Sequence, residues 1–154
     1  MKQTMKRITA VLVAVCLCML SVVSVFAQQD GPDVKAEAYC VINRKDGSIV
    51  YSKNMDDRYY PASITKIMTA LVAMEHADMD EVVTITASDV ALSADSQVCG
   101  LAEGDQIQMS ELFHALLVYS ANDAAMAIAR TVGDGSVDTF VQMMNETAQS
   151  LGMT

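Results

Sequence analysis

The sequence predicts a mixed α+β domain in which a β-hairpin precedes a mostly helical region. Two segments rich in β-forming residues, 37–43 and 48–52, flank an Asp46-Gly47 pair that supplies the backbone conformation of a tight hairpin turn. An apolar run follows Ser63, and three later segments also have the composition of helices. These observations place strands first and helices after them.

The first helix is expected to run from Ser63 to about His76, where the Ala77-Asp78-Met79-Asp80 segment breaks it. A short β-type run follows at residues 82–86. Residues 87–104 have weak periodicity and are expected to form a turn-rich loop.

The second half of the chain is expected to contain three more helices. Ser110 is expected to cap the first of them, and Gly133-Asp134-Gly135 is a strong stop signal for the second. The expected helices cover residues 111–118, residues 123–132 and, starting from Ser136 or Asp138, the segment that Gly152 closes.

The first 27 residues have the composition of a signal peptide. A basic start precedes a mostly apolar stretch over residues 8–26, and small residues at Val25 and Ala27 suit cleavage before Gln28. Because that stretch has 19 residues, an uncleaved anchor that associates the protein with a membrane is the alternative. We expect export to the periplasm or the cell-wall side of the membrane.

Cleavage would leave a mobile leader over residues 28–36 and a domain over residues 37–154. Three of the ten basic residues leave with the signal peptide and all 19 acidic residues stay, so the net charge falls from −9 to −12. Nucleic-acid binding rewards basic patches, so we expect no nucleic-acid partner. The negative charge serves solubility near an anionic cell envelope.

The mature chain keeps two cysteines, Cys40 and Cys99. They either pair in an oxidising compartment or remain two separate buried thiols, and both alternatives stay open. His76 and His114 are isolated and no Cys-x-x-Cys occurs, so we expect no metal site and no cofactor.

Ser63 and Lys66 lie three residues apart at the start of the first expected helix. On a helix this spacing puts two side chains on one face, with about 5–6 Å between Cβ atoms. The lysine amine can then reach the serine hydroxyl, as an activated serine nucleophile requires. A capping serine beside a solvated lysine is the alternative interpretation.

Ser120-Ala121-Asn122 lies between two apolar helical segments. Polar residues there need a reason, because burial of an unpaired polar group costs about 1–3 kcal/mol. In one interpretation Ser120 and Asn122 end one helix and cap the next. In the other they belong to the same site as Ser63 and Lys66.

Taken together, the two motifs resemble a known family. Pro-Ala-Ser-Ile-Thr-Lys at 61–66 and Ser-Ala-Asn-Asp-Ala-Ala at 120–125 are similar to motifs of the low-molecular-mass penicillin-binding proteins, the serine-type D-alanyl-D-alanine carboxypeptidases of peptidase family S11. The resemblance covers nearly all of residues 37–154 and implies a β-lactamase/transpeptidase-like fold.

The resemblance also implies the role of each site residue. Ser63 is the nucleophile that forms an acyl ester, Lys66 is its general base, Ser120 relays the proton to the leaving amine, and Asn122 binds the substrate backbone. The implied substrate is the D-Ala-D-Ala terminus of a peptidoglycan stem peptide, and β-lactams are the implied acylating inhibitors.

The family's third motif, Lys-Thr-Gly, does not occur in this sequence. We therefore expect only the N-terminal portion of the fold, without the central strands of its sheet. That portion is either an incomplete copy or a truncated product retained for another role. Without those strands, apolar helix faces are expected to stay exposed at Ile67, Leu71, Phe113 and Leu117.

Two rival functions remain. A serine β-lactamase would need a deacylating glutamate, for which only Glu146 follows Asn122. A non-catalytic envelope protein would use this half-domain as an interaction module.

Overall fold

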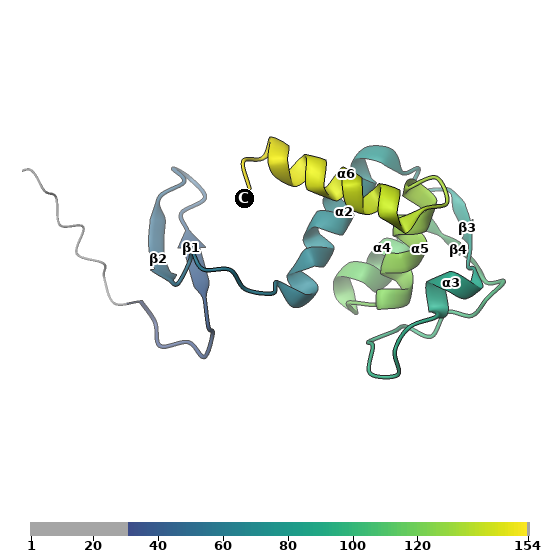
Figure 1. The fold of residues 1–154 in the computed structure, drawn as a ribbon, viewed down its shortest axis with the longest axis horizontal. Coiled ribbons are helices and arrows are strands. Elements are labelled where there is room, and N and C mark those ends of the chain that lie inside the picture. Colours follow the sequence, from purple (N-terminus) through teal and green to yellow (C-terminus); the bar gives the residue numbers. More distant parts are fainter. Residues whose placement is uncertain (1–30, 154) are drawn as a thin grey trace, which may run out of the picture. The chain divides into compact units, whose positions relative to one another are not determined.

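The computed structural model describes residues 31–153, which divide into a hairpin unit up to Tyr59 and a helical unit from Tyr60 onward (Figure 1). The predicted signal peptide and the start of the predicted leader lie outside the described residues. Within the described range, no helix has both the length and the apolar composition needed to cross a membrane.

The hairpin unit contains two antiparallel strands, β1 (Tyr39–Ile42) and β2 (Ile49–Lys53). Gly47 adopts a φ of 73°, in the left-handed region that glycine favours, as the Asp-Gly signal predicts. The Asp46 carboxylate accepts hydrogen bonds from the Ser48 amide at 2.9 Å and from the Ser48 hydroxyl at 2.6 Å. The predicted hairpin is therefore confirmed.

The helical unit begins with a short 3-10 turn, η1, which continues directly into α2. Farther along the chain, two short strands, β3 and β4, pair antiparallel. The elements of this unit are η1 (Ala62–Ile64), α2 (Thr65–His76), β3 (Val82–Thr84), α3 (Ala87–Val90), β4 (Gln106–Gln108), α4 (Met109–Val118), α5 (Asn122–Val132) and α6 (Val137–Ser150).

The core of the helical unit lies where α2, α4, α5 and α6 pack together (Figure 1). Helix α5 contributes mostly alanine, which lets its neighbours approach closely, and larger side chains fill the remaining space. The fully buried members include Val72, Leu112, Leu116, Ala124, Ala127, Ile128 and Phe140. Each large apolar side chain removed from water stabilises the fold by about 1.5–3 kcal/mol.

Three local features differ from the sequence-based expectations. Residues 87–104 contain the short helix α3, and Gln106–Gln108 pairs with β3 although its sequence lacks a strand pattern. Helix α4 starts at Met109, and Ser110 lies inside its first turn, so the predicted Ser110 cap is wrong. The amides of Met109 and Ser110 instead donate to backbone carbonyls of Glu81 and Met79, at 2.8 and 3.0 Å, so no side-chain cap is needed.

The start of α6 agrees with the prediction. The Ser136 hydroxyl accepts a hydrogen bond from the Thr139 amide at 3.2 Å, which is an N-cap contact. Gly133 precedes it at a close approach of two backbone segments, where a Cβ would lie 2.1 Å from the Ser136 carbonyl oxygen. Only glycine fits there, which explains why the chain can turn sharply between α5 and α6.

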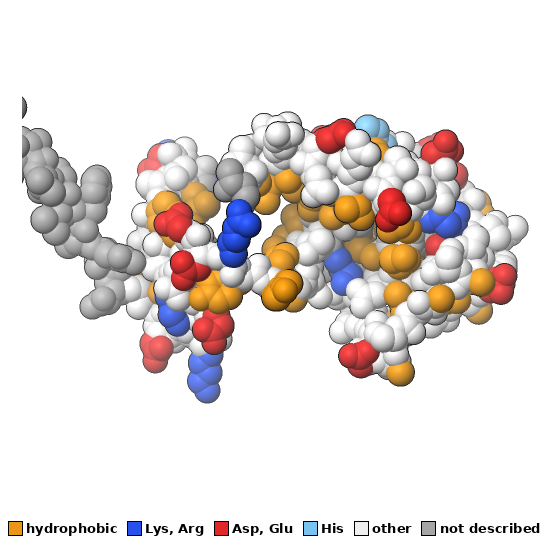
Figure 2. All heavy atoms as spheres, viewed as in Figure 1, with side chains coloured by type: hydrophobic (Ala, Val, Ile, Leu, Met, Phe, Trp, Pro, Cys, Tyr) orange, Lys and Arg blue, Asp and Glu red, His pale blue; other side chains and the backbone are white. Residues whose placement is uncertain are grey.

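Apolar side chains remain exposed on the helical unit, as expected. The exposed fractions of Ile67, Leu71 and Leu117 are 65%, 40% and 54%, and Figure 2 shows hydrophobic side chains at the surface along α2 and α6. The expectation for Phe113 is wrong, because this ring is only 8% exposed and belongs to the core cluster beside Leu112.

Candidate active site

Ser63 lies in the 3-10 turn that leads into α2. Pro61, with a φ of −73°, precedes the turn, and Ala62 adopts a positive φ of 47°. This bend presents Ser63 at the N-terminal end of α2 with its side chain exposed. The partial positive charge of a helix N-terminus favours a developing negative charge at such a position, by about 0.3–1 kcal/mol at an exposed site.

Ser63 contacts the second motif through Ser120. The Ser120 hydroxyl donates a hydrogen bond to Ser63 Oγ at 3.0 Å. Ser120 occupies the short connection between α4 and α5 and has a φ of 62°, in the left-handed region that non-glycine residues rarely adopt. The structure therefore brings together two serines that are 57 residues apart in the sequence.

Lys66 makes a second contact between the same two motifs. Its amine, on the first turn of α2, donates to Asn122 Oδ1 at 2.7 Å, and Asn122 is the first residue of α5. The Lys66 side chain is half-buried. Within the described residues, Lys66 forms no hydrogen bond with either serine. The four predicted residues thus meet where the N-termini of α2 and α5 come together.

This arrangement has the parts that acyl transfer needs. Ser63 offers an exposed hydroxyl oxygen to a substrate carbonyl, a second hydroxyl lies beside it, and the Lys66 amine follows in the first turn of α2. A general base is expected to tighten its contact only when substrate binds, so the spacing of Lys66 from Ser63 is compatible with that role.

Asp123, which directly follows Asn122, anchors a loop beside the site. Its side chain is 1% exposed and accepts backbone hydrogen bonds from Cys99 at 3.1 Å and from Gly100 and Leu101 at 3.0 Å. Burial acts to raise the pKa of Asp123, but these hydrogen bonds outweigh it, and the pKa lies below its ordinary value. The residue is ionised at neutral pH.

The two cysteines are both free and exposed, so the alternative of two buried thiols is wrong. The Cys99 thiol donates to Asp123 Oδ1 at 3.4 Å. Partial burial and the neighbouring Asp123 carboxylate raise the pKa of Cys99. Its thiol form is therefore favoured at neutral pH, which makes Cys99 a poor nucleophile.

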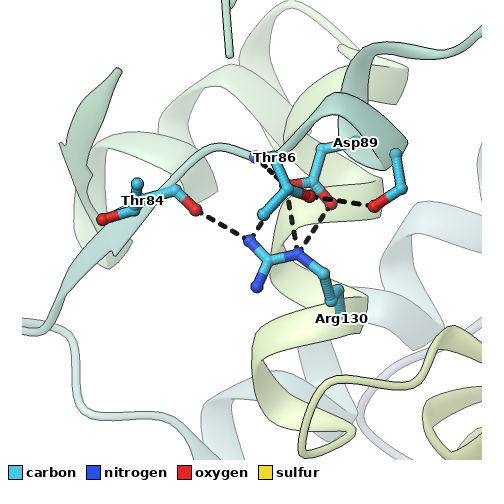
Figure 3. Close-up of polar contacts among 5 residues, drawn as sticks. Thr84, Thr86, Asp89 and Arg130 are labelled. Atoms are coloured by element: carbon cyan, nitrogen blue, oxygen red, sulfur yellow. Dashed lines mark hydrogen bonds and ion pairs between the residues drawn. The ribbon is translucent and has the colours of Figure 1, made fainter. Parts of the chain in front are cut away.

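A second buried carboxylate lies between α3 and α5 (Figure 3). Arg130 donates to both oxygens of Asp89, with Nε–Oδ1 and Nη2–Oδ2 distances of 2.9 Å, and to the Thr84 carbonyl at 2.9 Å. Asp89 also accepts hydrogen bonds from the amide and hydroxyl of Thr86. Burial alone would raise the pKa of Asp89, but the contacts with Arg130 and Thr86 hold it below its ordinary value.

Sequence reasoning missed both carboxylates. The Thr86 and Asp89 spacing is a capping-box signature, so the start of α3 had a readable signal. The Arg130 partner lies 41 residues away from Asp89, and no local pattern indicates such a pair. Asp123 stood inside the Ser-Ala-Asn-Asp-Ala-Ala segment that carries the resemblance, but an aspartate in the first turn of a helix is ordinary, and nothing in the sequence indicated that its side chain binds a loop.

Acid is expected to destabilise the helical unit through Asp89 and Asp123. Because both pKa values are lower in the folded state than the ordinary 3.8, the stability that these groups contribute is complete above that value and is lost as pH falls through the folded-state values. We expect the urea midpoint to stay level down to about pH 5 and to fall below about pH 4. A midpoint that does not change in acid would contradict this expectation.

The described residues contain no group of three or more His, Cys, Asp or Glu side chains arranged to hold a metal ion.

Comparisons with known proteins show that the similarity extends beyond the two motifs to most of the chain. The family model of the D-alanyl-D-alanine carboxypeptidases, peptidase S11, matches residues 24–154. The D-alanyl-D-alanine carboxypeptidase DacF of Bacillus subtilis is 32% identical over 157 residues, which cover 97% of this chain and 40% of that protein. DacA of Escherichia coli is 33% identical over 131 residues, covering 79% of this chain and 32% of its own length.

Solved structures give the same result. Penicillin binding protein 5 from Haemophilus influenzae superposes with a TM-score of 0.75 at 31% identity, over 82% of this chain and 38% of that one. A variant of the Streptomyces K15 DD-transpeptidase gives 0.75 at 32% identity, over 80% and 51%. The predicted β-lactamase/transpeptidase-like fold is thus confirmed for the part that these residues form.

The chain spans about a third to two fifths of the length of these curated relatives. Its own match to the family model nevertheless includes both motifs and every helix and strand of the structure. The chain therefore belongs to the peptidase S11 family, the D-alanyl-D-alanine carboxypeptidases.

Proposed function

We propose that Ser63 is the nucleophile of a serine-type D-Ala-D-Ala carboxypeptidase. One observation carries this proposal: the Ser63–Ser120 and Lys66–Asn122 hydrogen bonds join the two motifs into one site at two helix N-termini. If the two motifs only capped helices, each would contact the start or end of its own helix, and hydrogen bonds between the two motifs would not be expected.

In the proposed reaction, Ser63 Oγ attacks the carbonyl carbon of the terminal D-Ala-D-Ala peptide bond. The C–N bond breaks, the acyl group stays on Ser63 as an ester, and D-alanine leaves after its amine gains a proton. Lys66 takes the Ser63 proton, and Ser120 relays a proton to the leaving amine. Water then hydrolyses the ester and regenerates Ser63.

Asn122 is proposed to bind the substrate backbone. Its Oδ1 accepts from Lys66, while its Nδ2 makes no hydrogen bond among the described residues and can donate to a substrate carbonyl. The same contact holds the Lys66 amine near the start of α5. Asn122 would therefore orient the substrate and the general base together.

The proposed partners are peptidoglycan stem peptides that end in D-Ala-D-Ala, with β-lactams as acylating inhibitors. Export through the predicted signal peptide would place the protein in the periplasm or at the cell-wall side of the membrane, where it would act in cell-wall organisation and cell shape.

A three-substrate assay tests the proposal on the full chain. We expect a fluorescent penicillin to form an adduct that is hydrolysed slowly, a D-Ala-D-Ala peptide to release D-alanine, and nitrocefin to be hydrolysed little. Rapid nitrocefin hydrolysis would instead indicate a β-lactamase. In the structure, Glu146 of α6 accepts a hydrogen bond from Gln142 at 2.9 Å, and among the described residues it forms no hydrogen bond with Ser63. A folded sample that forms no adduct would support the non-catalytic alternative.

A further inference from the structure

We infer that Asp123 is a positioning residue for the Ser120-Ala121-Asn122 turn, which it holds through the neighbouring loop of residues 97–101. The kinetic part of this inference rests on the proposed function of Ser63. Among the described residues, Asp123 forms no hydrogen bond or ion pair with Ser63 or Lys66, so its effect on the reaction passes through the backbone that it holds.

Both carboxylate oxygens of Asp123 accept hydrogen bonds from the loop. Oδ1 accepts from the backbone amides of Cys99 at 3.1 Å and Ala124 at 3.0 Å, and Oδ2 accepts from those of Gly100 and Leu101 at 3.0 Å. Gly100 has a φ of 87°, a conformation that lets successive amides converge on one carboxylate. Hydrogen bonds to an ionised acceptor are about twice as strong as neutral ones.

The same loop contacts the residues on both sides of Ser120. The Gln97 carbonyl accepts a hydrogen bond from the Asn122 amide at 2.8 Å, and the Gln97 side-chain amide donates to the Tyr119 carbonyl. Ser120 lies between these two contacts in the left-handed conformation. That conformation costs a non-glycine residue roughly 1–2 kcal/mol and persists only where the surroundings hold it.

The hydrogen bonds of Asp123 to the loop and those of Gln97 to the turn together link Asp123 to Ser120. Asp123 fixes residues 99–101, and Gln97, two residues earlier, fixes the backbone around Ser120. The Ser120 hydroxyl in turn reaches Ser63 Oγ. If the carboxylate is lost, the loop is released and the turn no longer holds Ser120 at its position.

Asp123→Asn is the sharpest test, because it keeps the size of the side chain and replaces one acceptor oxygen by an NH₂ group that faces amide donors. Asp89→Asn is the matched control. Asp89 is equally buried, at 1% exposure, and is also held in its ionised form, but its partners are Arg130 and Thr86 rather than the loop. Both variants are expected to lower Tm.

The readouts are the rate constant for acylation by a penicillin and amide hydrogen exchange across residues 97–101. For Asp123→Asn we expect an acylation rate constant lower by about 10–100-fold, as for a small misplacement of a reacting group, together with faster exchange in the loop. For Asp89→Asn we expect an unchanged acylation rate constant and unchanged exchange in the loop.

Equal losses of acylation in the two variants would overturn the inference, since general destabilisation would then explain both. Loop exchange that Asp123→Asn leaves unchanged would overturn it as well. If the unmodified chain forms no penicillin adduct, the proposed function has failed. The exchange comparison of the two variants then decides by itself whether Asp123 holds the loop.

Discussion

Ser63→Ala is expected to abolish covalent labelling of the chain by a fluorescent penicillin. Removal of the hydroxyl removes the atom that forms the ester, and loss of a serine nucleophile lowers turnover by about 10³-fold or more. The measurement is adduct formation followed by mass spectrometry of the intact chain. Because the Ser63 side chain is exposed and lies outside the core, Tm is expected to stay near that of the unmodified chain.

Ser110→Ala is the matched control for this experiment. Ser110 lies in the first turn of α4, at the opposite end of that helix from Ser120, and its amide rather than its hydroxyl makes the contact with Met79. Its labelling should match that of the unmodified chain. If Ser63→Ala retained full labelling while Ser110→Ala also labelled normally, another nucleophile would carry the adduct, and the assignment of Ser63 would be wrong.

The elements that local chemistry specifies could be predicted from the sequence. The Asp46-Gly47 pair defined the hairpin turn, the apolar run after Ser63 defined α2, and Ser136 marked the start of α6. Each signal acts within a few residues of the structure that it produces. The spacing of Ser63 and Lys66 suggested a nucleophile and its base, and the resemblance implied the roles of all four site residues. The structure adds the hydrogen bond that places Ser63 beside Ser120.

The features that escaped prediction depend on partners distant in the sequence. Strand β4 is a strand because it pairs with β3, and the first turn of α4 needs no cap because carbonyls near β3 accept its amides. Phe113 looked like an exposed residue on an unpaired helix face, but packing into the core cluster buries it. Asp123 and Asp89 are ordinary helix-start residues in the sequence, and only tertiary contacts show what they hold.

Arg130→Ala is expected to be among the most destabilising single substitutions on the surface of the helical unit. The Arg130 side chain is 20% exposed, whereas that of Asp89 is 1% exposed, so the substitution leaves a desolvated carboxylate without its counter-ion. Loss of one partner from a buried ion pair costs about 3–5 kcal/mol, and we expect the lower end here because Arg130 is partly solvated. That is a large part of the roughly 5–15 kcal/mol by which domains are stable. Urea unfolding at neutral pH measures the loss.

The double variant Asp89→Asn/Arg130→Ala shows whether the ion pair is the cause. Once Asp89 is neutral, removal of Arg130 should cost much less than it does alone, since no buried charge is left unpaired. The cost of Arg130→Ala should also shrink in acid, where protonation of Asp89 has the same effect as the Asp89→Asn substitution. Strictly additive losses would contradict this account. They would mean that Arg130 stabilises the unit through its packing and its contact with the Thr84 carbonyl rather than through the charge of Asp89.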